Sequence, residues 1–465
     1  MRLYYGLTNY HLLCCILHKI IYGKNEQSIF VASQGILKNR MAALKKNGIF
    51  KEVYYLEDTD IRNRAFNSLN KKSTQKEIEN RISIFVAQYD KLLPFNIKDF
   101  SEIYLNADHG ALGIYVLAKQ YKYNYIEDGR GIYSNWKILD DLLKIKNPGL
   151  EKVCAYLNAY GRSEFIINRY IALDSQGVNY TNNGFYDFMV DKLLSSLPKS
   201  KMKKILNIFD VKKHHFYTNR KKALILTQRF STYKMLDDNE CILLYALLAD
   251  FSAPDCEIYL KPHPADKSEY IKLFDKKSII DREMPSELLP YSINAKFDIG
   301  ICTYSSSINS LKNDIDKIYN IDKSIVDKFK DIFKIYAIFE LAKSEFLKVI
   351  TNSDKLFYLF EEAYNLNSNN IVGYECDGKN FKATIRKTSF DGNNMIMRIS
   401  LIDRDNRLNL NINKNEYLYI KLHDLRLKES FLNFNLDKTL KLSRFNIKVE
   451  IKEIKKGDDA LWKNI

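Results

Sequence analysis

The chain lacks three patterns that would each indicate a large protein class. No Cys-x-x-Cys pair occurs, and the seven cysteines are scattered and odd in number, which argues against a zinc ribbon or a disulfide scaffold and favours reduced thiols. No uninterrupted apolar stretch is long enough to span a bilayer. No Gly-x-Gly-x-x-Gly occurs, so a dinucleotide is not expected.

The N-terminal stretch from Met1 to Gly23 also lacks the marks of a signal peptide. Four polar residues interrupt its apolar run, namely Asn9, His11, His18 and Lys19. No cleavage site of small residues follows it. We therefore expect a cytoplasmic protein whose contact with a membrane, if any, is peripheral.

What the chain does contain is typical of a globular protein with two or three domains. It has 465 residues, of which 46% are hydrophobic and 13% aromatic. Lysine and arginine total 72 against 57 acidic residues, a formal charge of +15. Such an excess suits an anionic partner, such as nucleic acid, an acidic membrane surface or a phosphorylated substrate. No named nucleic-acid-binding motif is present, so we expect no nucleic acid.

The first part of the chain alternates between short apolar runs and amphipathic segments. Strands are expected at residues 3–7, 28–33, 53–56, 102–106 and 123–126, with helices at residues 10–22, 36–46, 74–91 and 111–121. Residues 135–220 are expected to be mostly helical. This alternation predicts a parallel sheet covered on both faces, in a Rossmann-like domain over residues 1–195.

A second alternating series predicts a second domain of the same class, over residues 196–369. Its strands are expected at residues 223–227, 257–261, 278–280 and 297–302, with helices at residues 239–250, 267–274 and 285–289 and trailing helices at residues 325–366. Two such domains facing across a cleft form the arrangement called GT-B. After Asn370, short alternating strands with Asp-Gly turn signals predict an all-β module over residues 370–465.

Chemistry-bearing residues follow several of the expected strands, where an open α/β sheet binds its ligands. Glu127-Asp128-Gly129 closes a strand of the first domain, and adjacent carboxylates at a strand end point to opposite sides. In the second domain Lys261-Pro262-His263-Pro264 ends a strand, and the two prolines restrict the backbone around a histidine that titrates near neutrality. Ser305-Ser306-Ser307 follows a further strand and suits either a phosphate site or a helix cap.

Two weaker elements accompany these. Glu287, at the start of an expected helix in Pro285-Ser286-Glu287, can accept hydrogen bonds from a ribose or stabilise the helix dipole. Asp58-Thr59-Asp60 follows an expected strand and is interpreted as a solvated turn, although a metal is not excluded by it.

In this order the motifs resemble those of the bacterial GT-B sialyltransferases, especially the lipooligosaccharide sialyltransferase and capsular polysialyltransferase families. These share an acidic pair with a glycine, then His-Pro, then paired Ser/Ser or Ser/Thr residues. The corresponding residues are Glu127-Asp128-Gly129, His263-Pro264 and Ser305-Ser306-Ser307. The resemblance covers roughly residues 1–310 and does not include the C-terminal module.

The resemblance implies an inverting transfer from CMP-sialic acid. Glu127 or Asp128 would take the proton from the acceptor hydroxyl, with Asp237-Asp238 as a rival base. His263 would protonate or stabilise the departing phosphate, with help from Ser306 and Ser307. Further contacts with the donor are implied for Lys261, Pro264, Glu287, Ser305 and Gly129, and for Thr8 and Asn9 in the loop Thr8-Asn9-Tyr10.

The expected partners follow from the same resemblance. They are CMP-sialic acid, a glycan acceptor such as lipooligosaccharide or capsule, and the anionic inner face of the cytoplasmic membrane, with a homodimer as a candidate assembly. No cofactor or metal is expected, because the protein itself can meet the charge of a single phosphate. Two alternatives remain: transfer of another CMP-activated keto-acid sugar (Kdo, legionaminic or pseudaminic acid), and a non-catalytic basic glycan- or envelope-binding protein.

Overall fold

The chain folds as two compact units in a computed structural model. The structure describes residues 1–321 apart from residues 24, 130–146, 173–183, 214–219, 233, 254–255, 273, 294–295 and 304, together with residue 326 and the backbone of eight strands after residue 370. The first unit comprises Met1–His215, Glu283–Asn294 and Asn309–Leu311, and the second comprises the remainder. The expected helices at residues 325–366 lie almost entirely outside the described residues.

The first unit is built on a seven-stranded parallel sheet in the order β3-β2-β1-β4-β5-β6-β7. Its strands are β1 (Arg2–Gly6), β2 (Ser28–Ala32), β3 (Glu52–Tyr55), β4 (Glu102–Leu105), β5 (Tyr123–Ile126), β6 (Ile166–Ile171) and β7 (Phe185–Asp187). Strands β2 and β5 are buried at every position, as expected for a parallel sheet covered on both faces.

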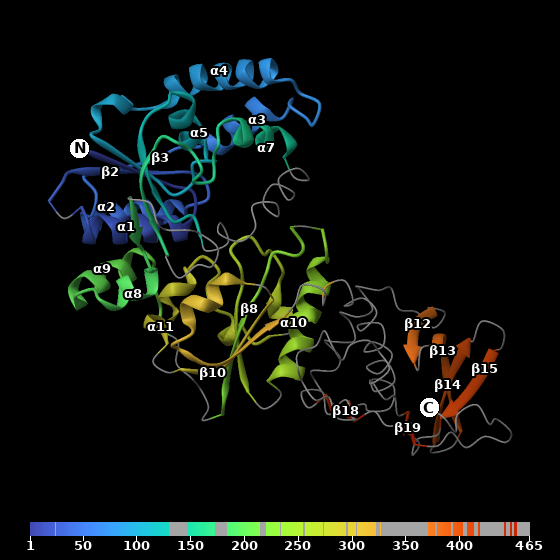
Figure 1. Cartoon of the computed structure of the whole chain (residues 1–465). Coiled ribbons are helices and arrows are strands. Elements are labelled where there is room, and N and C mark those ends of the chain that lie inside the picture. The colour runs from blue at the N-terminus through green and yellow to red at the C-terminus, as the bar shows by residue number, and fades with distance from the viewer. Residues whose placement is uncertain are drawn as a thin grey trace. The chain divides into compact units, whose positions relative to one another are not determined.

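Two groups of helices cover this sheet (Figure 1). On one side lie α1 (Asn9–Ile21), α2 (Lys38–Asn47), α8 (Val190–Ser195) and α9 (Lys199–Ile208), with α8 packed on α1 and α9 on α2. On the other side lie α3 (Asp58–Phe66), α4 (Gln75–Leu92), α5 (Ala111–Ala118) and α7 (Pro148–Tyr156), which pack on one another. Both α8 and α9 belong to the first unit, whose first segment runs to His215.

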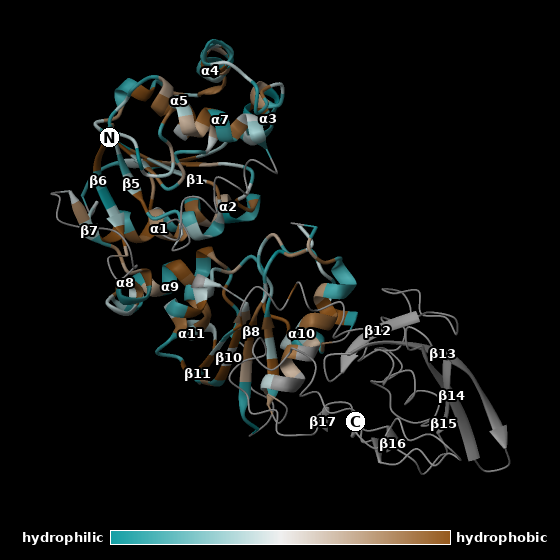
Figure 2. Cartoon of the chain, turned by 45° about the vertical axis from the view of Figure 1, so that its right-hand side comes forward, coloured by the Kyte–Doolittle hydropathy of each residue, from teal (hydrophilic) through white to brown (hydrophobic). Residues whose placement is uncertain are grey.

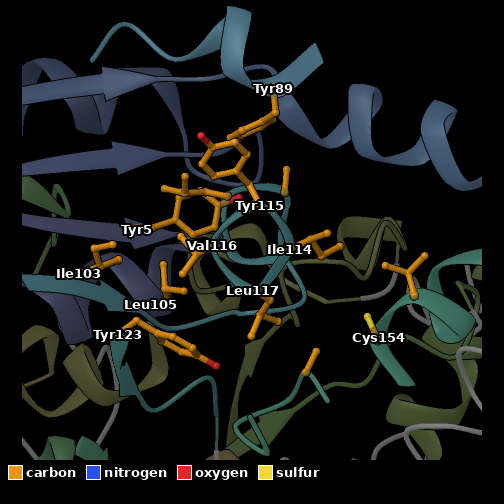
Figure 3. Close-up of a cluster of buried hydrophobic side chains, with 14 of the residues drawn as sticks. Tyr5, Tyr89, Ile103, Leu105, Ile114, Tyr115, Val116, Leu117, Tyr123 and Cys154 are labelled. Carbon is orange, nitrogen blue, oxygen red and sulfur yellow. The ribbon is translucent and has the colours of Figure 1, made fainter. Parts of the chain in front are cut away.

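The core of the first unit shows why these helices form where they do. Helix α4 buries Ile78, Ile82, Phe85 and Tyr89, the i, i+4, i+7 spacing of an amphipathic helix, and both hydropathy colours lie along it (Figure 2). Thr74 caps it in a reciprocal capping box with Glu77. Figure 3 shows Tyr89 gathered with Tyr5 and side chains from β4 and α5 in the same core.

The expectation of mostly helix over residues 135–220 is wrong for β6 and β7. Strand β6 carries Asn168 and Arg169 in its middle, which interrupt the apolar run that would have indicated a strand. Asn168 Nδ2 donates to Asn124 Oδ1 at 2.8 Å, and Arg169 Nε donates to the Gly161 carbonyl at 3.3 Å. Neighbouring groups thus satisfy both polar side chains within the sheet.

The second unit contains a smaller parallel sheet of four strands in the order β11-β10-β8-β9. Its strands are β8 (Lys222–Leu226), β9 (Glu257–Lys261), β10 (Phe297–Thr303) and β11 (Ile315–Ile321). Helix α10 (Asp238–Ser252) packs on β8 and β10. Short helical turns form η3 (Tyr270–Lys272), η4 (Lys276–Ser278) and η6 (Ser306–Leu311). In the first unit, the segment between β9 and β10 forms η5 (Ser286–Leu288) and α11 (Leu289–Ser292), and a further turn η1 (Ile97–Asp99) precedes β4.

Two expectations for this unit are corrected. Residues 278–280 do not form a strand: Asp275 caps the helical turn η4, and Ile279 makes only an isolated bridge to Leu260. The fourth strand is instead β11, whose run Ile-Asp-Lys-Ile-Tyr-Asn-Ile has too many polar residues to stand out as buried. The predicted class, α/β with parallel sheets, is confirmed, while the facing cleft of the GT-B arrangement stays a prediction.

After residue 370 the described backbone consists of antiparallel strands. β12 (Ile371–Cys376), β13 (Lys379–Asp391), β14 (Asn394–Ile402) and β15 (Arg407–Ile412) form a four-stranded sheet in chain order. Two further short pairs join β16 (Tyr417–Leu418) to β19 (Ile451–Lys452) and β17 (Lys441–Leu442) to β18 (Ile447–Lys448). A separate all-β module stays a prediction.

Candidate functional site

The strand order of the first sheet marks one edge as the place for a site. Strand β1 lies between β2 and β4, so the chain runs outward in opposite directions from the pair β1 and β4. Ligands of open α/β sheets bind outside the carboxyl ends of strands at such a point. The segments that leave this edge are the start of α1 after β1, residues 106–110 after β4 and residues 127–129 after β5.

Glu127 is the buried member of the acidic pair. It is 1% exposed, and its carboxylate accepts hydrogen bonds from the Tyr10 hydroxyl and from the backbone N–H of Ala172, both at 2.8 Å. Its own carbonyl accepts a bond from Asn106 Nδ2 at 2.9 Å. Burial and these bonds suit a residue that ties β5 to α1 and to the segment after β6.

Asp128 is the accessible member of the pair, with a side chain 20% exposed. His11 Nε2 lies 2.6 Å from its Oδ1 and 3.0 Å from its backbone carbonyl. His109 Nδ1 lies 3.9 Å from its Oδ2, too far for a hydrogen bond. Three neighbouring strand ends, those of β1, β4 and β5, thus bring one carboxylate and two imidazoles together.

The charge state of this cluster follows from its surroundings. Burial lowers the pKa of His109 to about 4 against the opposing pull of Asp128, so His109 is neutral at pH 7. Burial would raise the pKa of Asp128, but the adjacent His109 and His11 outweigh it and hold that pKa below its ordinary value. Because His109 is neutral at pH 7, the His11 hydrogen bond is the stabilising interaction at that pH.

Asp108 supports the loop that carries His109. Its buried carboxylate accepts bonds from the backbone N–H groups of Tyr160 at 2.6 Å and Gly161 at 2.8 Å, and from the Tyr123 hydroxyl at 2.8 Å. Burial raises its pKa to about 6 against these bonds. The His109 ring stacks on Tyr160, with ring centroids 4.8 Å apart. The loop after β4 is therefore anchored by the Asp108 carboxylate and by the His109 ring.

Gly129 ends this segment in a backbone conformation that favours glycine. Its φ is +146°, and a Cβ atom there would meet nothing within 4 Å. The constraint is therefore conformational and not steric. A direct contact between Gly129 and a donor stays a prediction.

The segment Thr8-Asn9-Tyr10 at the start of α1 lies beside the acidic pair, and its side chains have protein partners. Thr8 is the N-cap of α1, and its hydroxyl accepts from the backbone N–H of His11 at 3.2 Å. Asn9 Nδ2 donates to the carbonyl and carboxylate of Glu283, at 3.0 and 2.9 Å. Burial, followed by the influence of Cys14, Glu127 and Glu287, raises the pKa of Tyr10 well above its ordinary value, so this hydroxyl stays a donor to Glu127.

Glu287 belongs to the first unit although it lies in the chain between β9 and β10. It is 8% exposed and follows Pro285 in the helical turn η5. Ser310 Oγ donates to its Oε1 at 3.4 Å. A contact between Glu287 and a ribose stays a prediction.

In the second unit His263 follows β9, and its tautomer is set by the turn that it begins. The backbone N–H of Ala265 donates to His263 Nδ1 at 3.0 Å, so the ring proton lies on Nε2. Burial, and then the charges of Arg229 and Lys261, lower the pKa of His263 to about 4. At pH 7 His263 is therefore a neutral imidazole that presents one N–H.

A buried carboxylate organises this turn. Asp266 Oδ2 accepts from the hydroxyls of Thr227 at 2.5 Å and Tyr270 at 2.6 Å. Thr227 Oγ1 in turn accepts from the backbone N–H of His263 at 3.0 Å, and the Asp266 N–H donates to the His263 carbonyl at 2.9 Å. Asp266 therefore ties His263 to the end of the neighbouring strand β8.

Lys261 and Pro264 flank the histidine differently. Lys261 is 3% exposed, and its Nζ donates to the carbonyls of Pro262 at 3.1 Å and Arg282 at 3.0 Å. Those bonds are typical of a lysine that braces a turn. Pro264 is exposed. Donor contacts for both residues stay predictions.

The serines after β10 begin the helical turn η6. Ser305 occupies the N-cap position but makes no side-chain cap hydrogen bond, so the interpretation of these serines as a cap does not hold for it. Ser307 is partly exposed, and the Ser306 side chain lies outside the described residues. A phosphate contact from the three serines stays a prediction.

The remaining acidic candidates have structural roles. Asp237 is the N-cap of α10 and forms a reciprocal capping box with Glu240, and Asp238 begins the helix. Asp58 is fully buried and accepts hydrogen bonds from Ser33, Tyr5 and Tyr89. The interpretation of Asp58-Thr59-Asp60 as a solvated turn is therefore wrong, because this segment begins α3. Within the described ranges no group of three or more metal-ligating side chains is found.

The sequence missed His11 and His109 as site residues. His11 stood only as a polar interruption of an apolar run, and His109 lies in Asp108-His109-Gly110 directly after β4. The position of His109 after a buried strand was an available signal, of the same kind as the one that identified His263. No local signal could connect either residue to Asp128, because their proximity depends on the strand order β1-β4-β5.

Comparisons with known proteins place this chain in a family. The sequence model of the family described as alpha-2,8-polysialyltransferase matches residues 16–312, more than half of the chain. An uncharacterized protein of Haemophilus influenzae is 29% identical over 111 residues, which are 23% of this chain and 36% of that protein. The chain thus matches about a third of the length of this curated relative.

Similar solved structures include an alpha/beta-galactoside alpha-2,3-sialyltransferase from Photobacterium phosphoreum, at 11% identity and a TM-score of 0.40, covering 70% of this chain and 94% of that one. The UDP-GlcNAc 2-epimerase of Neisseria meningitidis is 13% identical with a TM-score of 0.38, covering 66% of this chain and 79% of that one. The identification depends on the family model, which spans both the acidic pair and the His-Pro segment. The chain belongs to the alpha-2,8-polysialyltransferase family.

Proposed function

We propose that the protein transfers sialic acid from CMP-sialic acid, with inversion and without a metal, to a hydroxyl of a cell-surface glycan. The observation that carries the proposal is the position of Asp128. Its carboxylate is accessible, has a pKa that His109 and His11 hold below its ordinary value, and lies at the carboxyl edge of the sheet. A general base for an acceptor hydroxyl needs these properties.

The structure favours Asp128 over the other candidate bases. Both Glu127 carboxylate oxygens accept hydrogen bonds within the protein, and the residue is 1% exposed. Asp237 is committed to a helix cap. We assign Asp128 as the base and Glu127 as the residue that anchors the strand end beneath it.

We propose that His263 donates a hydrogen bond to the departing phosphate. Its Nδ1 accepts the Ala265 N–H, so the Nε2–H is the ring group that we propose for the phosphate oxygen. The donor carries a single phosphate, so N–H and hydroxyl groups can meet its charge. Ser305, Ser306, Ser307 and Lys261 are proposed to share this task, Pro264 and Gly129 to line the site, and Glu287 to hold the ribose.

The positive charge of the chain suits this chemistry. CMP-sialic acid and a sialylated or otherwise acidic acceptor are both anionic, and so is the inner leaflet of a cytoplasmic membrane. Each Lys or Arg close to such a leaflet contributes about 1 kcal/mol of attraction. We propose a peripheral association, and among the described helices none has the length and apolar character needed to cross a membrane.

The test compares two nearly isosteric variants, Asp128→Asn and Glu127→Gln. CMP release from CMP-sialic acid is measured in the presence of a chelator, with sialic-acid-terminated and lactose-type acceptors. Asp128→Asn is expected to lower kcat by roughly 10²- to 10⁴-fold, the contribution of a general base. Glu127→Gln is expected to lower the free energy of unfolding by about 1–3 kcal/mol, because one hydrogen bond loses its acceptor, and to keep kcat within about tenfold.

The proposal fails if Asp128→Asn keeps parental turnover, or if a chelator abolishes activity that a divalent metal then restores. The same assay with CMP-Kdo, CMP-legionaminic acid and CMP-pseudaminic acid tests the alternative donors. Faster CMP release from one of these than from CMP-sialic acid would replace the donor and leave the assignment of the base in place.

A further inference from the structure

His11 makes two different hydrogen bonds through its two ring nitrogens. The backbone N–H of Leu7 donates to Nδ1 at 3.1 Å, so Nδ1 carries no proton and Nε2 carries it. Nε2 in turn lies within hydrogen-bond distance of both the carboxylate Oδ1 and the main-chain carbonyl of Asp128. One imidazole thereby joins the backbone after β1 to the side chain and backbone of the residue after β5.

The imidazole is fixed in this position by its surroundings. The His11 side chain is 3% exposed, and its own backbone N–H is capped by Thr8 Oγ1 at 3.2 Å. Gly6 leaves room for it, because a Cβ atom at Gly6 would lie 3.0 Å from His11 Cβ. A ring held in this way imposes its geometry on Asp128.

The two oxygens of Asp128 are made unequal by this contact. Oδ1 accepts the His11 N–H. His109 Nδ1 lies 3.9 Å from Oδ2, too far for a hydrogen bond. Oδ2 is then the oxygen suited to take a proton from an acceptor hydroxyl. A hydrogen bond to the ionised carboxylate also favours that form over the protonated one.

We propose that His11 is the positioning residue of the catalytic base: its Nε2–H orients the Asp128 carboxylate and assigns Oδ2 as the basic oxygen. The inference rests on the proposed role of Asp128 as the base. His11 itself takes up no proton in the reaction, because its Nδ1 is committed to the Leu7 N–H. Among the residues that the structure describes, other titratable or charged groups around Asp128 include Asp108 and His109 from the loop after β4, Tyr160 from the turn after α7, and Arg62 of α3, which acts on His109.

Two substitutions of similar size separate the two hydrogen bonds. His11→Gln places an amide N–H near the position of Nε2 and can still donate to Asp128. His11→Asn places a carbonyl oxygen near the position of Nδ1, can still accept from Leu7, and is too short to reach Asp128. A role confined to holding the start of α1 requires the bond that Asn keeps, whereas positioning of the base requires the bond that Gln keeps.

The experiment measures the pH profile of kcat/KM for CMP release by the full-length protein. Catalysis falls on the acidic side as Asp128 becomes protonated, so losing the His11 donor raises the pKa of Asp128 and moves that limb to higher pH. For His11→Asn we expect a shift of about one pH unit and a fall in kcat of roughly 10- to 100-fold, with an unchanged KM for the donor. His11→Gln is expected to keep the parental limb.

The inference is overturned if both variants keep the acidic limb of the parental pH profile, or if that limb shifts equally in both. Asp128→Asn separates this failure from that of the proposed function: if Asp128→Asn is inactive and His11→Asn is normal, only the role of His11 is lost. Nitrogen-15 NMR of the imidazoles in the unsubstituted protein gives a second readout that needs no folded variant. We expect the Nε2–H tautomer for His11, and an Nδ1–H tautomer would contradict the proposal.

Discussion

His18 is a buried histidine, away from the site, that is held neutral. Its ring is fully buried in α1, with Nδ1 3.0 Å from the Tyr4 hydroxyl and Tyr104 4.5 Å away between ring centroids. Burial, and then the charge of Arg2, lower the pKa of His18 to about 3. The folded chain therefore resists a proton that the unfolded chain accepts.

The sign of the resulting pH dependence follows from that difference. The unfolded chain binds the proton below about pH 6.5 and the folded chain does not until about pH 3, so stability is present above pH 6.5 and is lost as the pH falls. His18→Phe keeps the aromatic contacts and removes this term. Between pH 7 and pH 4.5 the free energy of unfolding should fall in both proteins. We expect the fall in His18→Phe to be smaller than the fall in the parent by about 2–3 kcal/mol.

Urea unfolding at the two pH values measures this difference, with Tyr4→Phe as the control. Tyr4→Phe removes the same hydrogen bond but keeps the imidazole, so it should lose stability at both pH values and retain the parental pH dependence. An unchanged pH dependence in His18→Phe would show that His18 is protonated in the folded chain.

Among the elements, the segments that position the site differ in how well the sequence predicts them. Strands β1, β2, β4 and β5 were predicted to within a residue or two, because their apolar runs are short and bounded by turn residues. β6 and β11 were missed because polar side chains break their apolar runs. In β6 the Asn168 amide is satisfied by Asn124 on the neighbouring strand β5, which lies 44 residues away in the chain. Hydropathy along the sequence does not carry that information.

The same limit applies to the candidate site. Glu127-Asp128-Gly129 and His263-Pro264 could be identified because each lies directly after a readable strand. The distinction between Glu127 and Asp128 could not, since it depends on Tyr10 and Ala172 on one side and His11 on the other. These contacts exist only once β5 lies beside β4 and β6, and β4 beside β1.

In the turn after β9, two substitutions can separate the stability of the turn from the position of His263. Thr227 and Tyr270 each donate one hydroxyl to Asp266 Oδ2, and only Thr227 also accepts the backbone N–H of His263. Thr227→Val and Tyr270→Phe should each lower the free energy of unfolding by about 1 kcal/mol, the usual contribution of one hydrogen bond. Only Thr227→Val should also lower kcat for CMP release, by roughly tenfold or more, because His263 is then misplaced.

Denaturant unfolding and steady-state kinetics on the same preparations test this pair. A fall in kcat of equal size in both variants would mean that Asp266 acts through general stability and not through the position of His263.

At the scale of the whole molecule, the extent of the family match and the extent of the parallel sheets agree. The match ends at residue 312, and the last parallel strand, β11, ends at Ile321. The antiparallel strands after residue 370 are outside the match. The residues proposed for base, phosphate donor and donor-site contacts all precede residue 311.

A chain ending at residue 369 should therefore retain the chemistry. We expect kcat for CMP release with a short sialylated acceptor to stay within a few-fold of the full-length value, because no proposed site residue is removed.

If the C-terminal strands bind acceptor glycan, KM for long acceptors should rise while KM for short ones does not. The same truncation carrying Asp128→Asn supplies the inactive control, and sedimentation of both lengths shows whether the removed strands mediate self-association. Loss of CMP release by a soluble, cooperatively unfolding 1–369 chain would place part of the catalytic machinery after residue 369.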